Sequence, residues 1–175
     1  MQTVVGTWKH YSTRRAEDDA SFRAGLELAR KGELAKAFKM FYRSHAKGNP
    51  DATFSLGVWH KEKLIKNHSD RIAFRYFQNA AKGKHALAFF ELGRCYSEGT
   101  GVAMSKFKAE QSYLAASKLG NFDAMYNYAV VRMQRVTFDA QVERWLLKAC
   151  RHGDKDAIRL MREQKRSPRR KRRVS

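Results

Sequence analysis

Apolar residues along the middle of the chain recur at the spacing of an α-helix, three or four residues apart. Phe54 and Val58 give one example, with Trp59 beside them, and the same spacing returns in later segments. The only two prolines are Pro50 and Pro168, so the long stretch between them lacks the residue that breaks helices most strongly. The pattern predicts an all-α protein.

A short phrase, Gly-Asn/Asp-x-Asp-Ala, recurs along the chain. It is found at residues 48–52, 120–124 and 153–157, and a weaker form, GKHALA, occupies 83–88. The glycines of these phrases lie 33–37 residues apart. A second phrase keeps the same spacing, an alanine two residues before an aromatic residue and then a small pair that ends at Gly25, Gly57, Gly93 or Ala129. Such a period indicates a repeat protein.

Each repeat is predicted to be a pair of helices. The glycine of the phrase ends one helix, because glycine adopts the left-handed conformation at little cost. The Asp that follows can begin the next helix by accepting hydrogen bonds from its free N–H groups. Alanines at fixed positions allow two helices to approach closely. One such unit cannot bury its apolar face alone, so it must stack on its neighbours.

The GTG segment at residues 99–101 has the composition of half a phosphate-binding loop. We predict helices at 86–97 and 105–118 on either side of it, and no strand pattern precedes it. The residues that follow are Val-Ala-Met, whereas a phosphate loop requires Gly-Lys-Ser/Thr after a strand. The segment is therefore predicted to be a turn between the two helices of one unit.

The best-kept unit is ALAFFELGRCYSEGTGVAMSKFKAEQSYLAASKLGN, residues 86–121. Its characteristic positions are Ala88, Leu92, Gly93, Tyr96, Gly99, Gly101, Val102, Lys108, Ala109, Tyr113, Ala116 and Gly120. In these positions the unit resembles the Sel1-like repeat, a relative of the tetratricopeptide repeat. The resemblance covers roughly residues 18–160, and residues 32–49 look like a tetratricopeptide second helix.

The resemblance implies an α/α solenoid of Sel1-like or tetratricopeptide-like helical hairpins, wound as a right-handed superhelix with a concave groove. Proteins of this kind usually act as adaptors or scaffolds for other proteins and have no catalysis of their own. We therefore expect a protein-interaction module and no enzyme. The expected organisation is an N-terminal segment at 1–16, a solenoid at 17–164 and a basic, disordered tail at 165–175.

The groove is expected to bind another protein or a peptide through the first helices of the units. The candidate contacts, at equivalent positions outside the predicted core, are Ser55, Trp59, Glu91, Arg94, Asn127 and Val131. For Trp59 the competing interpretation is a buried structural residue, which the burial habits of tryptophan favour.

The net charge of +19 predicts attraction to polyanions such as nucleic acid. Part of this charge is concentrated at the C-terminal end. The candidate polyanion-binding residues there are Lys165, Arg166, Arg169, Arg170, Lys171, Arg172 and Arg173. Three uses of this tail stay open: contact with the phosphates of nucleic acid or with another polyanion, a nuclear-import signal, and solubility.

A second hypothesis makes the solenoid itself the nucleic-acid-binding surface, as in an RNA-associated or ribonucleoprotein subunit. It depends on whether the basic residues outside the tail form one stripe. The residues that decide this are Arg94, Arg132, Arg135, Arg144, Lys148 and Arg151. An enzyme is the third hypothesis and ranks last, because the segments outside the repeats are short and carry no motif.

No cofactor or metal is expected. The two cysteines, Cys95 and Cys150, have no His or Cys partner at ligand spacing, and the six histidines form no ligand pair. The first residues show no secretory signal, and no run approaches about 18 apolar residues. We expect a cytoplasmic protein with free thiols, or one associated with the nucleus or with nucleic acid.

Overall fold

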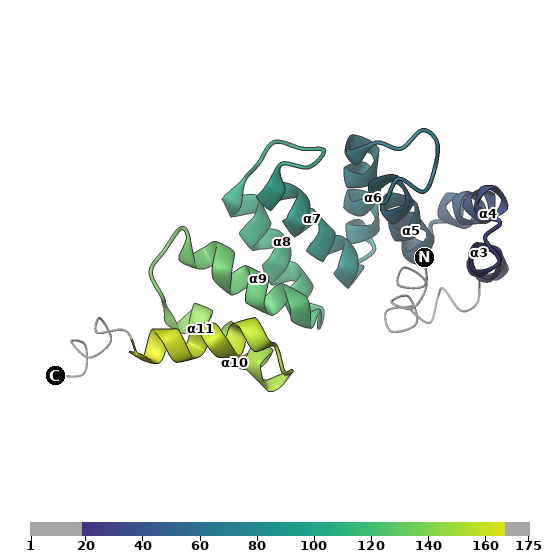
Figure 1. The fold of residues 1–175 in the computed structure, drawn as a ribbon. Helices are drawn as coiled ribbons and strands as arrows, with labels where there is room; N and C mark the ends of the chain where they lie inside the picture. The colour runs from purple at the N-terminus through teal and green to yellow at the C-terminus, as the bar shows by residue number, and fades with distance from the viewer. Residues whose placement is uncertain (1–18, 167–175) are drawn as a thin grey trace.

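The structure is a computed structural model that describes residues 19–166 (Figure 1). Within this range the regular secondary structure is α-helical, which confirms the predicted fold class. The helices are α3 (Ala20–Arg30), α4 (Leu34–Ala46), α5 (Pro50–Lys61), α6 (Asp70–Lys82), α7 (Ala86–Glu98), α8 (Lys106–Lys118), α9 (Phe122–Met133), α10 (Ala140–Arg151) and α11 (Lys155–Arg166). The N-terminal segment 1–16 lies outside the described residues.

The helices form hairpins that stack on one another. We number the hairpins as unit 1 (α3 and α4), unit 2 (α5 and α6), unit 3 (α7 and α8) and unit 4 (α9 and α10), and α11 packs on α10. The second helix of each unit also packs on the first helix of the next unit. In Figure 1 the hairpins form a curved row, with α3 seen nearly end-on and α9 and α11 seen lengthwise. This is the predicted α/α solenoid.

Polar side chains begin most of the first helices. Asp19, Asn49 and Asn121 accept hydrogen bonds from backbone N–H groups of the following turn at 2.8–3.3 Å. Asp154 does the same at the start of α11, at 2.9 Å. The glycines before three of these caps have φ of +82°, +88° and +81°: Gly48, Gly120 and Gly153. The repeated phrase is therefore the junction between units, as the sequence predicted, but the cap is the Asn or Asp directly after the glycine, whereas the Asp two residues later lies in the first turn of the helix.

The weaker phrase at 83–88 departs from this prediction. Gly83 has φ −79°, and the left-handed residue is Lys84, at φ +59°. His85 takes the capping place, where its Nδ1 accepts the N–H of Ala88 at 3.2 Å. A Cβ on Gly83 would lie 2.8 Å from the Cβ of Pro50. The prediction of a left-handed glycine here is wrong, because Gly83 is required for close packing against α5.

In three units a glycine of the first helix lies directly against an aromatic ring of the second helix. A Cβ added to any of these glycines would stand 2.6–2.8 Å from the ring, so even alanine would displace it. The pairs are Gly25–Phe41, Gly57–Phe77 and Gly93–Tyr113. The small pair in the sequence therefore sets how closely the two helices of a hairpin approach.

The core runs through the solenoid as three clusters of aromatic, aliphatic and alanine side chains. Phe41 and Trp59 lie in the N-terminal cluster, Phe77 in the middle one, and Tyr113 and Tyr128 in the C-terminal one. All five are buried. The aromatic residues therefore serve mainly as core.

The segment at 99–101 is a turn, as predicted. Gly99 ends α7 with φ +76°, and its N–H donates to the carbonyl oxygen of Cys95 at 2.8 Å. Gly101, at φ +71°, lies against the backbone at the start of α6, where an added Cβ would overlap the carbonyl group of Asp70. This second glycine therefore joins unit 3 to unit 2.

Candidate interaction surface

Three of the six predicted groove residues are buried. Ser55 is fully buried, and its hydroxyl donates to the carbonyl oxygen of Asp51 at 2.6 Å. Trp59 is 2% exposed, with its ring centroid 5.4 Å from that of Phe41, and Val131 is also buried. The prediction that these three side chains are exposed in a groove is therefore wrong. First helices from α5 onward are covered by their own second helix and by that of the unit before, which leaves few positions open.

Two other groove candidates belong to a network of charged side chains on the first helices α5 and α7. The Lys61 ammonium lies 2.8 Å from a carboxylate oxygen of Glu91, which joins the two helices. Arg94 lies 3.8 Å from Glu91 and 3.5 Å from Glu98. The side chain of Arg94 is 40% exposed, so part of this network faces solvent.

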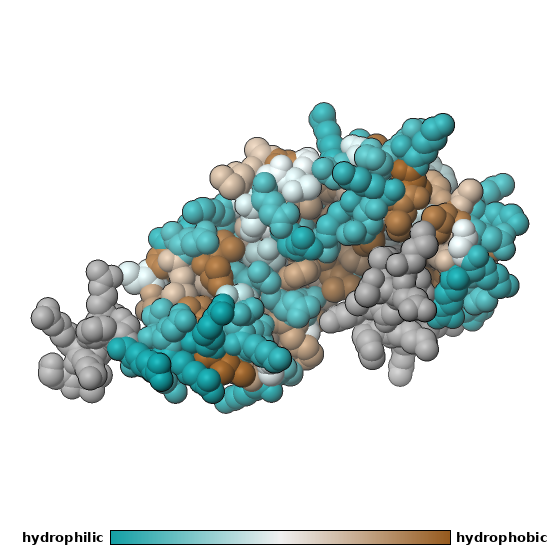
Figure 2. Space-filling model, viewed as in Figure 1, coloured by the Kyte–Doolittle hydropathy of each residue, from teal (hydrophilic) through white to brown (hydrophobic). Residues whose placement is uncertain are grey.

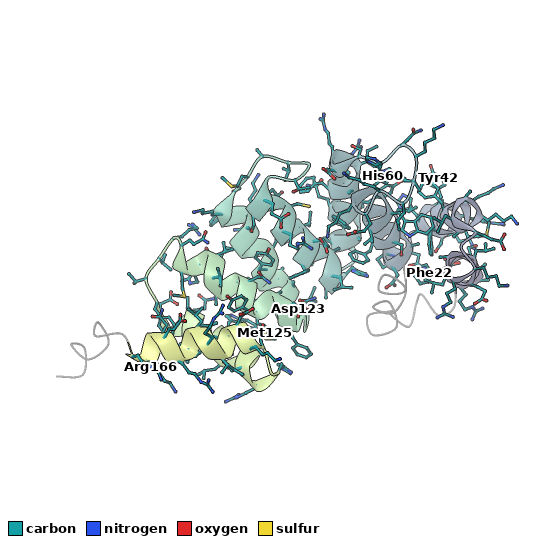
Figure 3. All side chains as sticks on the ribbon, in the orientation of Figure 1. Phe22, Tyr42, His60, Asp123, Met125 and Arg166 are labelled. Carbon is teal, nitrogen blue, oxygen red and sulfur yellow. The ribbon has the colours of Figure 1, made fainter. Side chains whose placement is uncertain are left out.

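The sixth candidate, Asn127, lies on α9 and is half-buried. Its Nδ2 donates to the carbonyl oxygen of Asp123, one turn earlier, at 2.8 Å. Asp123 is labelled in Figure 3, close to the start of α9. Asn127 therefore keeps its amide oxygen available for a partner.

A buried carboxylate between units 3 and 4 was missed by the sequence analysis. Glu110 on α8 accepts hydrogen bonds from Arg132, at 2.7 Å, and from Arg135. Arg132 also donates to Asp139 at 2.7 and 3.1 Å. Hydrogen bonds to Asp139 and Glu110 raise the pKa of Arg132, and the guanidinium holds the pKa of Asp139 below its usual value. These ion pairs connect α8, α9 and the segment between α9 and α10.

The sequence does carry a signal for this network. Glu110 follows Ala109 as Phe74 follows Ala73 in unit 2, and all four side chains are buried. A charged residue at a core position of an amphipathic helix indicates a buried ion pair. Its partners lie at the end of α9 and in the following loop, so no spacing along the chain identifies them.

A histidine–aromatic cluster lies between units 1 and 2. The Tyr76 ring centroid is 5.4 Å from that of His45 and 5.6 Å from that of His60. His45 Nδ1 lies 2.8 Å from the Thr53 hydroxyl, whereas His60 Nδ1 is buried with no hydrogen-bond partner among the described residues. Burial lowers the pKa of both imidazoles. The ring of Tyr42, beside His45, continues the cluster to the surface (Figure 3).

No grouping of three His, Cys, Asp or Glu side chains that could hold a metal ion occurs in residues 19–166. Both cysteines are free. Burial raises the pKa of the Cys95 thiol to about 11 and also raises that of Cys150, so neither is a reactive thiolate at neutral pH. Within the described range, no helix combines the length and apolar character needed to span a bilayer.

The basic residues chosen to test the nucleic-acid hypothesis do not share one environment. Lys148 lies over the Trp145 ring, with its ammonium 4.4 Å from the centroid, and Arg144 and Arg151 are exposed. The other three form ion pairs with carboxylates: Arg94, Arg132 and Arg135. These six residues are therefore not one stripe of unpaired charge.

Two of the tail candidates, Lys165 and Arg166, form the exposed last turn of α11 and so belong to the solenoid. The remaining tail candidates lie outside the described residues: Arg169, Arg170, Lys171, Arg172 and Arg173.

No model of a known protein family matches the chain. Solved structures with a similar fold exist. One is a Sel1 repeat protein from Oxalobacter formigenes, with a TM-score of 0.69 and 24% identity, covering 79% of this chain and 56% of that one. Another is a protective antigen of uropathogenic Escherichia coli strains that displays an SLR fold, with a TM-score of 0.72 and 18% identity, covering 81% of this chain.

The chain spans about half of the first of these proteins and about a third of the second, at 56% and 32% of their lengths. The repeat units, their glycine junctions and these alignments agree with the resemblance seen in the sequence. The chain has the α/α solenoid fold of Sel1 repeat proteins.

Proposed function

We propose that this protein is a scaffold that holds a peptide or helix of another protein along its first helices. The Sel1 repeat fold supports a role in protein–protein interaction. The observation that carries the proposal is the network of Lys61, Glu91, Arg94 and Glu98 on α5 and α7. The proposal assigns binding and no catalysis.

The network suits a binding surface because its members hold one another in place. Glu91 is 13% exposed and is held from two sides, whereas Arg94 and Glu98 are 40% and 54% exposed. A partner would meet donors and acceptors whose side chains are already ordered, which lowers the entropy lost on binding. We include Asn127, on the first helix of unit 4, in the proposed binding surface.

The test is selection of binders from a random-peptide library on the full chain, followed by measurement of their affinities. We expect Arg94→Ala to weaken binding of the selected peptides about tenfold or more, the cost of losing a charge-assisted hydrogen bond. Asn127→Ala should weaken binding about threefold, the cost of losing a neutral hydrogen bond. Gln78→Ala, at an exposed position on the second helix α6, is the matched control and should change little. Equal affinities in all variants would contradict the proposal.

We also propose that the basic segment 165–175 contacts nucleic acid or another polyanion. In support, seven of the nine residues in KRSPRRKRR are basic. A chain truncated after residue 164 should bind nucleic acid more weakly and with a shallower dependence on salt. Unchanged binding would reject this use, and nuclear accumulation of a reporter fused to the segment would then favour the import signal.

A further inference from the structure

We propose that the second helices present a basic stripe that binds the phosphate backbone of single-stranded nucleic acid. This surface differs from the first-helix network and from the tail, so the inference does not depend on either. The basic stripe consists of Lys39 on α4, Arg75 and Lys82 on α6, Lys118 on α8, and Arg144 and Arg151 on α10.

Charge is divided unequally between the two helices of a unit. The four first helices α3, α5, α7 and α9 together contain five Lys or Arg and five Asp or Glu. The four second helices α4, α6, α8 and α10 contain twelve Lys or Arg and three Asp or Glu. Among the residues within these eight helices, the excess positive charge therefore lies on the second helices.

The stripe residues occupy repeating positions. Each second helix has a large, buried residue at the same place in the repeat, and we use it to mark the core side of the helix: Phe41, Phe77, Tyr113 and Leu146. Three stripe residues stand two positions before this marker and three stand five positions after it. At about 100° per residue, both positions lie roughly 140–160° around the helix from the marker. The stripe therefore points away from the core in unit after unit, and all six residues are exposed.

The stripe residues also differ in their partners from the basic residues of the two ion-pair networks. Lys61, Arg94, Arg132 and Arg135 all contact carboxylates of the solenoid. Within residues 19–166, no stripe residue forms an ion pair, and no acidic residue occupies the stripe positions. Unpaired charges of one sign on one surface repel one another, and a polyanion would relieve that repulsion while releasing its own counterions.

The shape of the solenoid favours a flexible polyanion. The helix axes turn from one unit to the next, so the outer sides of the four second helices do not lie in one plane (Figure 1). A flat bilayer, or a duplex with a persistence length of about 50 nm, would reach only part of the stripe. On the face drawn in Figure 2, hydrophilic residues separate the apolar patches.

One aromatic ring lies beside the stripe. Tyr42 follows Lys39 by three residues on α4 and is 55% exposed (Figure 3). Exposed aromatic rings next to basic side chains are surfaces on which unpaired bases stack. Tyr42 therefore adds a contact that single strands can use and that a duplex, with its bases already stacked, cannot.

The test compares two variants of the full chain with the same loss of charge. The stripe variant carries Arg75→Gln, Lys82→Gln, Lys118→Gln and Arg144→Gln. The control variant carries Arg30→Gln, Lys31→Gln, Lys36→Gln and Arg159→Gln, exposed residues that each pair with an acidic residue on or next to their own helix. Thermal unfolding followed by circular dichroism checks that both variants fold.

Binding of fluorescent single-stranded RNA and DNA of one mixed sequence is measured between about 50 and 200 mM salt. We expect the stripe variant to bind at least about tenfold more weakly, with a salt slope smaller by about 3, since each phosphate contact on a single strand contributes about 0.7. In the control variant, the salt slope should decrease by less than half as much as in the stripe variant. Tyr42→Ala should weaken binding about fivefold or more. Similar results for RNA and DNA support the shared phosphate chemistry.

Three outcomes would overturn the proposal. Equal losses in the stripe and control variants would mean that only net charge matters. Binding that disappears on truncation after residue 164 but survives in the stripe variant would assign it to the tail. Stripe-dependent binding to vesicles containing phosphatidylserine, without binding to oligonucleotides, would assign the surface to membranes. The peptide selection tests the first-helix network independently, so none of these results bears on that proposal.

Discussion

Two junctions of the solenoid connect their units with different kinds of side chain. One junction lies between units 1 and 2, and the other lies between units 3 and 4. The first is filled by neutral rings, with Tyr76 between His45 and His60. The second is held by charge, with Arg132 between Glu110 and Asp139. Because a solenoid contacts mainly its nearest neighbours, each end responds to conditions through its own junction.

The difference teaches that the repeat fold constrains the helix-to-helix spacing more than the chemistry between units. The glycine–ring contacts that fix the spacing recur in units 1, 2 and 3. The rings that fill the first junction and the ion pairs that hold the second do not recur in the other units. The two ends should therefore be separable by mutation, by pH and by salt.

The largest effect is expected from Trp59→Ala in the N-terminal cluster. Removing a side chain that is 2% exposed and packed on Phe38 and Phe41 should lower the free energy of unfolding by about 3–5 kcal/mol. Hydrogen exchange should show lost protection in units 1 and 2, with units 3 and 4 still protected. Uniform loss along the chain would show that the two ends unfold together.

At the other end, Glu110→Ala should lower the free energy of unfolding by about 2–3 kcal/mol, because two guanidinium groups lose a charged acceptor. Denaturant titration measures the change, and hydrogen exchange should locate it in units 3 and 4. Glu110→Gln, which keeps an acceptor oxygen, is the control and should cost less. A larger loss of unfolding free energy for Glu110→Gln than for Glu110→Ala would contradict the stabilising role of the Glu110 ion pairs.

Acidification should loosen the N-terminal junction first. Burial lowers the folded-state pKa of His45 and His60 below the ordinary value of 6.5, so the unfolded chain binds more protons and stability falls as the pH drops below 6.5. The pKa of Asp139 is lowered from 3.8, so its contribution persists above that value and is lost only at lower pH. Hydrogen exchange between pH 7 and 5, corrected for intrinsic rates, should therefore show weakening in units 1 and 2 alone. His60→Phe should reduce this pH dependence.

The smallest effect is expected from Arg135→Ala. Its side chain is 35% exposed, and Arg132 still satisfies Glu110. We expect a loss of about 0.5–1 kcal/mol, typical of a partly exposed ion pair, that shrinks at high salt. Thermal unfolding at low and high salt measures it. A loss as large as that of Glu110→Ala would mean that Arg135 is the main partner of the carboxylate.

The repeat architecture was predictable because its signals are local. A glycine and a capping Asn are adjacent at residues 48–49 and 120–121, where one helix ends and the next begins. The left-handed backbone conformation of Lys84 was not predictable in this way. Gly83 is needed for its contact with Pro50, at the start of the other helix of the same unit, so a packing requirement took the place of the turn signal.

The binding surface was less predictable because exposure depends on two neighbours. The sequence predicted groove contacts at Ser55 and Trp59, yet both are buried because α4 and α6 cover α5 from two sides. Predicting the basic stripe also requires knowledge of which residues are buried. The six stripe residues can be recognised as one surface only after the buried marker residue of each second helix is known.

The contact of Gly101 with the backbone of Asp70 has a consequence for the engineering of this solenoid. Part of the surface that completes unit 2 is supplied by the loop of unit 3, so the boundary drawn by the sequence repeat is not a boundary of cooperative structure. A repeat excised, duplicated or exchanged at the glycine junctions would separate α6 from the loop it was built against. Modules of this protein that are to be moved intact should carry the first turn of α6 and residues 99–104 together.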